Sequence, residues 1–169
     1  MNQQVIISAL SANAGIFKSL LSGLEDEQIH FKQTEDKWSL LEIVCHLHDE
    51  ELEDFRARTK LALFSPESPL VSIDPQAWVK SRNYAAQNFN ERLEAFLHER
   101  EVSVQWLQQL ENPNWSSAYV HPKFGAMSSN MFLSNWLAHD YLHIRQILAV
   151  KHHYLAAYCK EDIGYAGTW

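Results

Sequence analysis

The sequence has few of the residues that interrupt helices, since glycine and proline occur only five times each among 169 residues. Chains of short strands and tight turns need many of both, so this scarcity favours long helices. Apolar residues make up 46% of the chain and aromatic residues 12%. That composition excludes an intrinsically disordered chain, and the length predicts one domain, residues 1–169, with a substantial core.

Cysteine is scarcer still. Cys45 and Cys159 are too few for a disulfide framework and do not form a C-x-x-C pair. The chain does not begin with a basic segment followed by a long apolar core, and no apolar run reaches the ~20 residues that span a bilayer. We therefore expect no signal peptide, no membrane partner, and a cytoplasmic protein whose thiols stay reduced.

Positive charge is also limited. The formal net charge is −7, and lysine and arginine form no run anywhere. Nucleic-acid binding depends on basic surface that displaces counterions, so we expect no nucleic-acid partner. The acidic run from His48 to Asp54 could hold a cation, although such a run is more often a solvated helix face.

Apolar residues recur at helical spacing in four segments. The second segment begins with a capping box formed by Ser39 and Glu42, and the third with an Asp74 N-cap followed by Pro75. The third would be about 54 Å long as a single helix, so we expect a bend between residues 97 and 103. The four predicted helices cover residues 5–24, 39–62, 74–111 and 128–152.

The connections between these helices show no usable periodicity, and none has the alternation of a convincing strand. We interpret them as loops, the last of which is ordered. The sequence thus predicts an all-α four-helix bundle with long inter-helix loops. The length of the loops leaves the up-and-down order of the helices open.

His139 and His143 stand four residues apart on the last predicted helix, about 40° apart around its axis, so both imidazoles can reach one metal ion. A helical wheel places both on the buried side, near Trp136. One histidine there is more often a hydrogen-bonded core residue, but two at ligand spacing point to a metal site. Open catalytic zinc sites usually have three protein ligands, so a third ligand is needed.

Two histidines on the second predicted helix, His46 and His48, are candidates for the third ligand. On the wheel His48 falls within the apolar side of that helix, whereas His46 points towards the polar side. Periodicity alone therefore favours His48. Without further information, His46 reads as an exposed surface histidine.

Three motifs, in order, resemble those of the DinB-like family. They are W-S-L-L-E-I-V-C-H-L from Trp38, followed by an acidic cluster, H-P-K-F-G from His121, and H-D-Y-L-H-I-R-Q-I from His139. Each motif alone is moderately specific. Together they cover nearly the whole chain from residue 38 to residue 150.

The resemblance implies a four-helix bundle that holds a divalent metal, zinc or nickel, through His46, His139 and His143. It favours His46 over His48, against the wheel. A metal near one end of the bundle, in an open cleft, would take its ligand from the edge of the apolar side. His48 departs from the small residue usual in the family, which leaves room for it to orient a ligand or to be the alternative ligand itself.

The resemblance also implies a function. Characterised members include transferases that use low-molecular-weight thiols on electrophilic small molecules, so we expect a metal-dependent thiol S-transferase or hydrolase. The partners of the protein would be a small-molecule substrate, for which a low-molecular-weight thiol is one candidate, and a second copy of the chain in a homodimer. The alternative is a non-catalytic metal-binding or interaction bundle, which the sequence does not separate from an enzyme.

No residue is assigned a catalytic role on the sequence alone. Three polar residues lie within a turn of the ligands and could orient them; these are Asp49, Glu50 and Gln146. The motif H-D-Y-L-H differs from the metalloprotease motif H-E-x-x-H, because Asp140 is one methylene shorter, so Asp140 reads as a structural partner. Cys45 points about 100° away from His46, which favours a buried, unreactive thiol.

Overall fold

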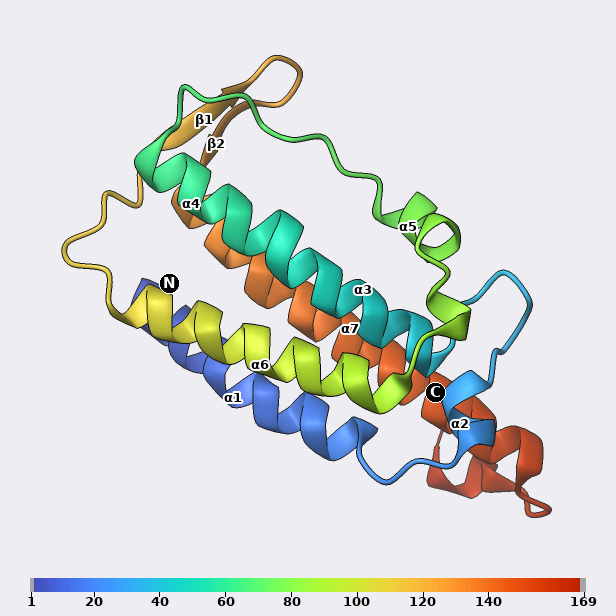
Figure 1. The fold of residues 1–169 in the computed structure, drawn as a ribbon. Coiled ribbons are helices and arrows are strands. Elements are labelled where there is room, and N and C mark those ends of the chain that lie inside the picture. The colour runs from blue at the N-terminus through green and yellow to red at the C-terminus, as the bar shows by residue number, and fades with distance from the viewer. Residues whose placement is uncertain (1, 168–169) are drawn as a thin grey trace.

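Four helical columns form the body of the computed structural model, which describes residues 2–167 (Figure 1). The columns are α1 (Gln3–Leu21), the continuous series α3 (Leu40–Glu50), π-helical η1 (Glu51–Arg56) and α4 (Ala57–Phe64), then α6 (Phe89–Gln108) and α7 (Ser129–Tyr158). A short α2 (Asp26–His30) lies in the first connection, and a 3-10 turn η3 (Ile163–Ala166) in the tail. The predicted all-α four-helix bundle is confirmed.

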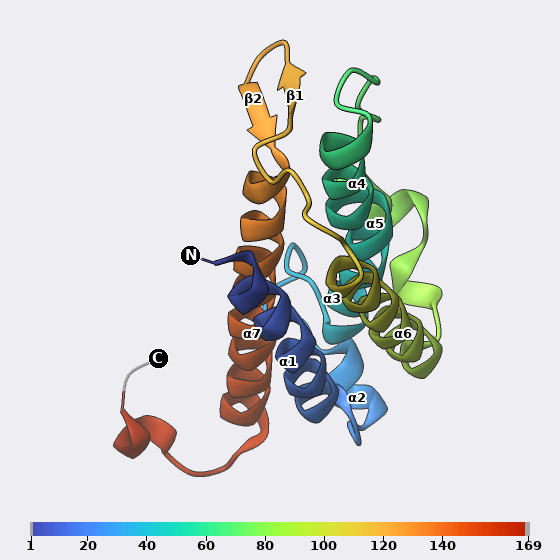
Figure 2. The ribbon, with the colours of Figure 1, turned by 90° about the vertical axis from the view of Figure 1, so that its left-hand side faces the viewer.

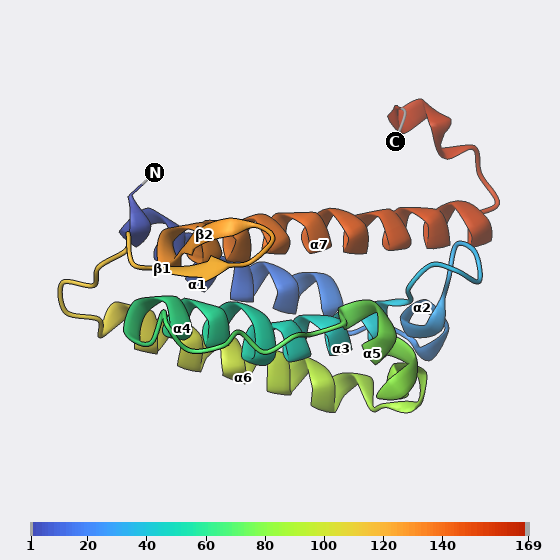
Figure 3. The same ribbon diagram turned by 90° about the horizontal axis from the view of Figure 1, so that it is seen from above.

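The columns run in two directions (Figures 1 and 3). Helices α1 and α7 run one way, and α3–α4 and α6 run the other. Both α6 and α7 contact α1 on one side and the α3–α4 column on the other, so α1 and α3–α4 lie at opposite corners. Helix α6 lies parallel to its neighbour, the α3–α4 column. Residues 65–88, which connect the two, therefore return the chain to the end of the bundle where α3 begins.

The predicted helix starts are confirmed by their capping hydrogen bonds. Ser39 Oγ accepts from the Glu42 amide at 3.3 Å, and the Glu42 carboxylate accepts from the Ser39 amide at 2.8 Å. Asp74 caps α5 (Pro75–Ser81), and Ser128 caps α7. These local signals succeed because each side chain satisfies an amide that has no partner within its own helix.

The helix predicted over residues 74–111 is broken, but not at the predicted bend. Helix α5 ends at Ser81, Asn83 takes a left-handed φ of 49°, and the 3-10 turn η2 (Tyr84–Ala86) follows. Asn88 then caps α6, which runs uninterrupted through residues 97–103. Asparagine tolerates both the left-handed conformation and the capping position, so the two asparagines mark the real break.

The prediction of no strand is wrong for residues 112–127. Strands β1 (Ala118–His121) and β2 (Gly125–Ser128) form an antiparallel hairpin, which continues the line of α7 at the start of that helix (Figure 2). Gly125 provides a positive φ of 75° at the turn. His121 Nδ1 accepts from the backbone amides of Lys123 and Phe124 at 3.0 and 3.2 Å, which closes the turn.

Helix α1 is long and apolar enough to cross a membrane by length and composition alone, with a mean hydropathy of 1.3. In this fold α1 packs against α6 and α7 and buries one apolar side in the bundle. The buried apolar residues of that side are Ile6, Ile7, Leu10, Phe17 and Leu21.

Candidate metal centre

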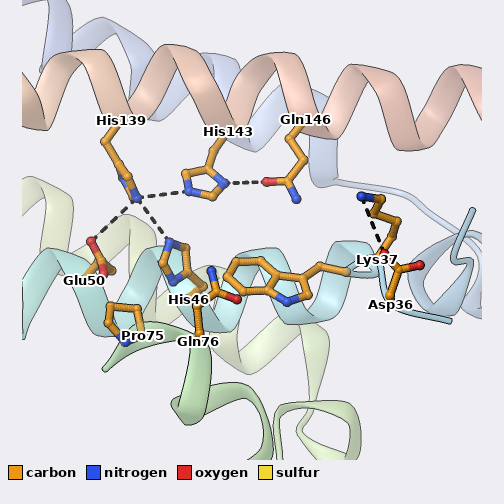
Figure 4. Close-up of a pocket in the computed structure, with 10 residues that line it drawn as sticks. Asp36, Lys37, His46, Glu50, Pro75, Gln76, His139, His143 and Gln146 are labelled. Atoms are coloured by element: carbon orange, nitrogen blue, oxygen red, sulfur yellow. Dashed lines mark hydrogen bonds and ion pairs between the residues drawn. The ribbon is translucent and has the colours of Figure 1, made fainter. Parts of the chain in front are cut away.

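Three imidazoles meet between α3 and α7 (Figure 4). His46 extends from α3, and His139 and His143 extend from α7. The Nε2 atom of His139 lies 3.1 Å from Nε2 of His46 and 3.0 Å from Nε2 of His143. The structure therefore brings together the three histidines that the family resemblance selected, with one donor nitrogen of each within 4.8 Å of the others.

Different neighbours hold the rings. His143 Nδ1 lies 2.8 Å from Gln146 Oε1, which only accepts, so Nδ1 carries the proton and Nε2 presents a lone pair to the cluster. The Trp38 ring packs on His46, with 4.8 Å between the ring centroids. Among the described residues, the buried Nδ1 of His46 has no hydrogen-bond partner.

All three imidazoles are neutral at pH 7. Burial lowers the pKa of His46 to about 3, and repulsion from His143 adds to this effect. Burial, with repulsion from both other histidines, lowers the pKa of His139 to about 2. Burial also lowers the pKa of His143 to about 4, although the bond to Gln146 opposes the shift. Neutral imidazole is the form that binds a metal.

The arrangement fits a divalent cation. His139 Nε2 has an imidazole nitrogen on each side and can direct one hydrogen at only one of them. A cation held by all three nitrogens removes this conflict. Nitrogens about 2.0–2.1 Å from a zinc ion lie roughly 3.3 Å apart in a tetrahedron. This is close to the 3.0 and 3.1 Å that separate His139 Nε2 from the nitrogens of His143 and His46.

A cavity of about 540 Å³ lies beside the three histidines. Its other walls come from the segment before α3, from α5 and from α7, and comprise Asp36, Lys37, Trp38, Pro75, Gln76 and Gln146 (Figure 4). Glu50 also lines the cavity, with Oε2 3.6 Å from His139 Nε2. Burial raises the pKa of Glu50 to about 7, repulsion from Asp54 adds to the shift, and Arg58 opposes it. The volume suits a small molecule.

The other sequence candidates lie elsewhere. His48 faces α6, where Nδ1 lies 3.1 Å from Arg92 Nη1 and 3.0 Å from Asp49 Oδ1. Asp49 accepts from Arg82 and from the Tyr84 hydroxyl, both at 2.7 Å, and does not contact the histidine cluster. Of the three residues expected to orient ligands, Gln146 bonds one histidine and Glu50 lies beside another.

A buried ion network next to the site was not found from the sequence. Arg100 of α6 is 1% exposed and donates to Glu51 of η1 at 2.9 Å and to Asp140 of α7 at 2.6 Å. Asp140 is thus a structural partner, as its position in the motif indicated. Trp136 Nε1 also donates to Glu51, at 2.9 Å. Arg100 interrupts an otherwise apolar pattern, which is the only signal of this network in the sequence.

At the start of the π-helical segment η1, two consecutive carboxylates have different surroundings. Glu50, the last residue of α3, lines the cavity beside His139, whereas Glu51, the first residue of η1, is 1% exposed and bonds Arg100. Single π-helical turns inside helices are frequent at functional sites. Here the widened turn lies directly against the histidine cluster.

Fold and site together define a helical bundle with three histidines at ligand spacing, open to a polar cavity. Residues 9–147 match the model of the DinB superfamily. This match covers most of the chain, and the protein belongs to that superfamily.

A solved structure shares the fold. YfiT from Bacillus subtilis superposes with a TM-score of 0.78 at 18% sequence identity, over 89% of this chain and 86% of that one. It is described as a probable metal-dependent hydrolase with an unusual four-helix bundle topology. A search of curated proteins found no significant match. At this identity the likeness to YfiT establishes the fold only.

Proposed function

We propose that this protein is a divalent-metal-dependent enzyme acting on a small molecule, with His46, His139 and His143 as the metal ligands. The observation that carries the proposal is the convergence of three neutral imidazole nitrogens on the wall of a polar cavity. A bound zinc or nickel ion would supply Lewis acidity, which acidifies a water or thiol and polarises an electrophile. Three ligands leave a position open for such a group.

Hydrolysis is the first candidate reaction, and the description of YfiT supports it. Gln146 holds His143 in the tautomer that directs Nε2 to the cluster. Glu50 Oε2, on the cavity side of His139, is placed to accept a hydrogen bond from a nucleophilic water. Trp38 and Pro75 add apolar side chains to the wall of the cavity.

Thiol S-transfer is the second candidate. Asp36 and Lys37 line the same cavity and carry opposite charges, 3.6 Å apart. Such a pair suits a zwitterionic low-molecular-weight thiol, whose amino and carboxylate groups would meet one partner each. A homodimer and a cytoplasmic location form part of the proposal, and a non-catalytic metal-binding bundle is the alternative to it.

Metal analysis tests the ligand set. The purified protein should contain about one divalent ion per chain by plasma mass spectrometry, and a His139→Ala/His143→Ala variant should contain none. His46→Ala should lose most of the metal, whereas His48→Ala, two residues along the same helix, should keep it. Unchanged metal content in the double variant would refute the assignment. Loss of metal in His48→Ala alone would make His48 the ligand.

An activity screen tests the reaction class. The metal-loaded protein should hydrolyse small esters or amides, or should join a thiol to an electrophile, at a rate that falls to background after the metal is removed. Turnover with esters alone would favour the hydrolase, and thiol-dependent consumption of the electrophile would favour the transferase. Full metal occupancy without turnover of either kind would favour the non-catalytic bundle.

A further inference from the structure

His139 lies between two cavities of different character. On the side away from the polar cavity, a groove of about 450 Å³ runs between the α3–α4 column and the first half of α7, beside β2. His139 lines both. The apolar residues that line this second groove, here called the apolar groove, are Phe55, Met127, Met131, Phe132, Ala138 and Leu142.

Besides His139, three polar residues line the apolar groove, and each contacts a residue of its own helical column. Arg58 Nε lies 2.9 Å from Asp54 Oδ1 in an ion pair within one helix. Asn135 donates its amide hydrogen to the Met131 carbonyl oxygen at 2.9 Å. Because six of the ten lining residues are apolar, the groove would recognise a ligand mainly through apolar contact.

The apolar groove meets the histidine cluster at His139, which is the member of the cluster that lines it. The Phe55 ring packs against the His139 ring, with 4.8 Å between the centroids. At the outer edge, Leu142 is 52% exposed although it stands one residue before His143. The two methionines can adapt to ligands of different shape because their side chains are unbranched and polarisable. An exposed apolar surface that adjoins a polar reaction site is typical of a ligand-binding groove.

We propose that the apolar groove holds the hydrocarbon body of the substrate while its reacting group lies at the histidine cluster. The substrate class is then a small molecule with an aliphatic or aromatic tail next to a polar, metal-binding group. The polar cavity on the other side of His139 is left for water or the polar cosubstrate. This inference rests on the proposed metal site and adds the chemical class of the substrate to it.

Aliphatic hydroxamates provide a binding test that does not need the natural substrate. Their head group chelates metal ions, and their tail can be lengthened one methylene at a time. Isothermal titration of the zinc-loaded protein should show affinity rising by up to about fourfold for each methylene from acetohydroxamate to octanohydroxamate. The increase should level off when the tail fills the groove.

Leu142→Asp tests whether the tail lies in the apolar groove. The ratio of octanohydroxamate to acetohydroxamate affinity should fall at least tenfold in this variant, and a second variant, Met131→Gln, should lower it in the same direction. Leu155→Asp is the matched control, because Leu155 lies on the same helix with the same 52% exposure but outside the groove. It should leave the ratio unchanged.

The outcomes separate this inference from the proposed function. If acetohydroxamate binds the metal-loaded protein but a longer tail adds no affinity, the apolar groove is not the substrate site. The same conclusion follows if the three variants lower the ratio equally. If the chain binds zinc at no detectable level, or the bound zinc takes up no hydroxamate, then the proposed function fails and this inference fails with it.

Discussion

At the residue scale, Gln146 decides which nitrogen of His143 faces the cluster. Its Oε1 accepts a hydrogen bond from His143 Nδ1 at 2.8 Å. A ligand imidazole that loses such a partner can rotate or change tautomer. Gln146→Met keeps the length of the side chain but removes the acceptor. We expect zinc affinity to fall roughly 10–100-fold in this variant, measured by competition with a chromophoric chelator.

Gln146→Glu is the control for that measurement. Its carboxylate still accepts from Nδ1, so zinc affinity should stay within a few-fold of the wild-type value. Gln76→Met serves as a second control, because Gln76 lines the same cavity but is not joined to any of the three histidine rings in Figure 4. Equal affinities for the wild type and Gln146→Met would show that packing alone orients His143.

The residues of the site were predictable to different degrees. The pair His139 and His143 follows from spacing on one helix, which geometry alone predicts. The choice between His46 and His48 does not follow from a helical wheel, because every residue of α3 except His48 is buried. A helix covered on all sides has no polar face, so periodicity carries no information there. The wheel placed His46 towards solvent, whereas it is 5% exposed.

At the element scale, Asp49 of α3 forms hydrogen bonds to the segment between α5 and α6. Its carboxylate accepts from Arg82 and Tyr84, each at 2.7 Å. Burial alone would raise the pKa of Asp49, but hydrogen bonds from His48, Tyr84 and Arg82 outweigh it and lower the pKa to about 2. The position of α5, whose first residues Pro75 and Gln76 line the cavity, therefore depends in part on an ionised carboxylate.

This arrangement makes stability depend on pH in a defined direction. The folded pKa of Asp49 lies below its ordinary value of 3.8, so the carboxylate stabilises the fold fully above about pH 4 and loses this effect as the pH falls towards 2. Asp49→Asn should lower the free energy of unfolding by about 2 kcal/mol at pH 6, with a much smaller difference near pH 2.5. Urea unfolding at several pH values measures both.

Glu53→Gln is the matched control for Asp49→Asn. Glu53 accepts from the same guanidinium at 2.7 Å, but its side chain is 46% exposed. Solvent screens such a pair, so this variant should change the free energy of unfolding by less than about 1 kcal/mol at either pH. A difference between wild type and Asp49→Asn that does not shrink in acid would contradict the assignment to ionised Asp49.

Two of the features that the sequence did not predict, the π-helical turn of η1 and the break after α5, have residues that bond to partners far along the chain. Capping signals marked the starts of α3, α5 and α7, because a cap is a local hydrogen bond. The π-helical turn of η1 has no side-chain cap. Its first residue, Glu51, bonds Arg100, which is 49 residues later in the chain. Asn83 and Asn88 mark the break after α5 locally, and Tyr84 bonds it to Asp49, 35 residues earlier.

At the scale of the whole molecule, Arg100 joins all four columns. Its guanidinium on α6 donates to Glu51 in the α3–α4 column and to Asp140 on α7, and it contacts the Leu10 carbonyl oxygen of α1 at 3.4 Å. Asn13 of α1 also donates to Asp140, at 2.9 Å. Both acidic partners adjoin residues of the site, Glu50 and His139, so this network bonds the two helices that carry the histidines to α6 directly beside the site.

Removing the cation should destabilise the whole bundle. Arg100→Met leaves two buried carboxylates without a positive partner, and we expect a loss of about 3–5 kcal/mol in the free energy of unfolding by urea. Zinc should bind more weakly in the same variant, because the two carboxylates repel each other and move η1 away from α7. Arg56→Met is the matched control, since Arg56 pairs with Glu99 at 2.7 Å in a more exposed position, and it should cost about 1 kcal/mol.

A triple variant distinguishes charge from packing as the cause. In Arg100→Met/Glu51→Gln/Asp140→Asn the three side chains keep their approximate volumes but lose their charges, so most of the stability lost in Arg100→Met should return. The Trp136 and Asn13 donors still find an amide oxygen at positions 51 and 140 in that variant. If stability returns and zinc affinity does not, then the network positions the histidines through its charged geometry. If neither returns, the arginine side chain acts through its packing between the four helices.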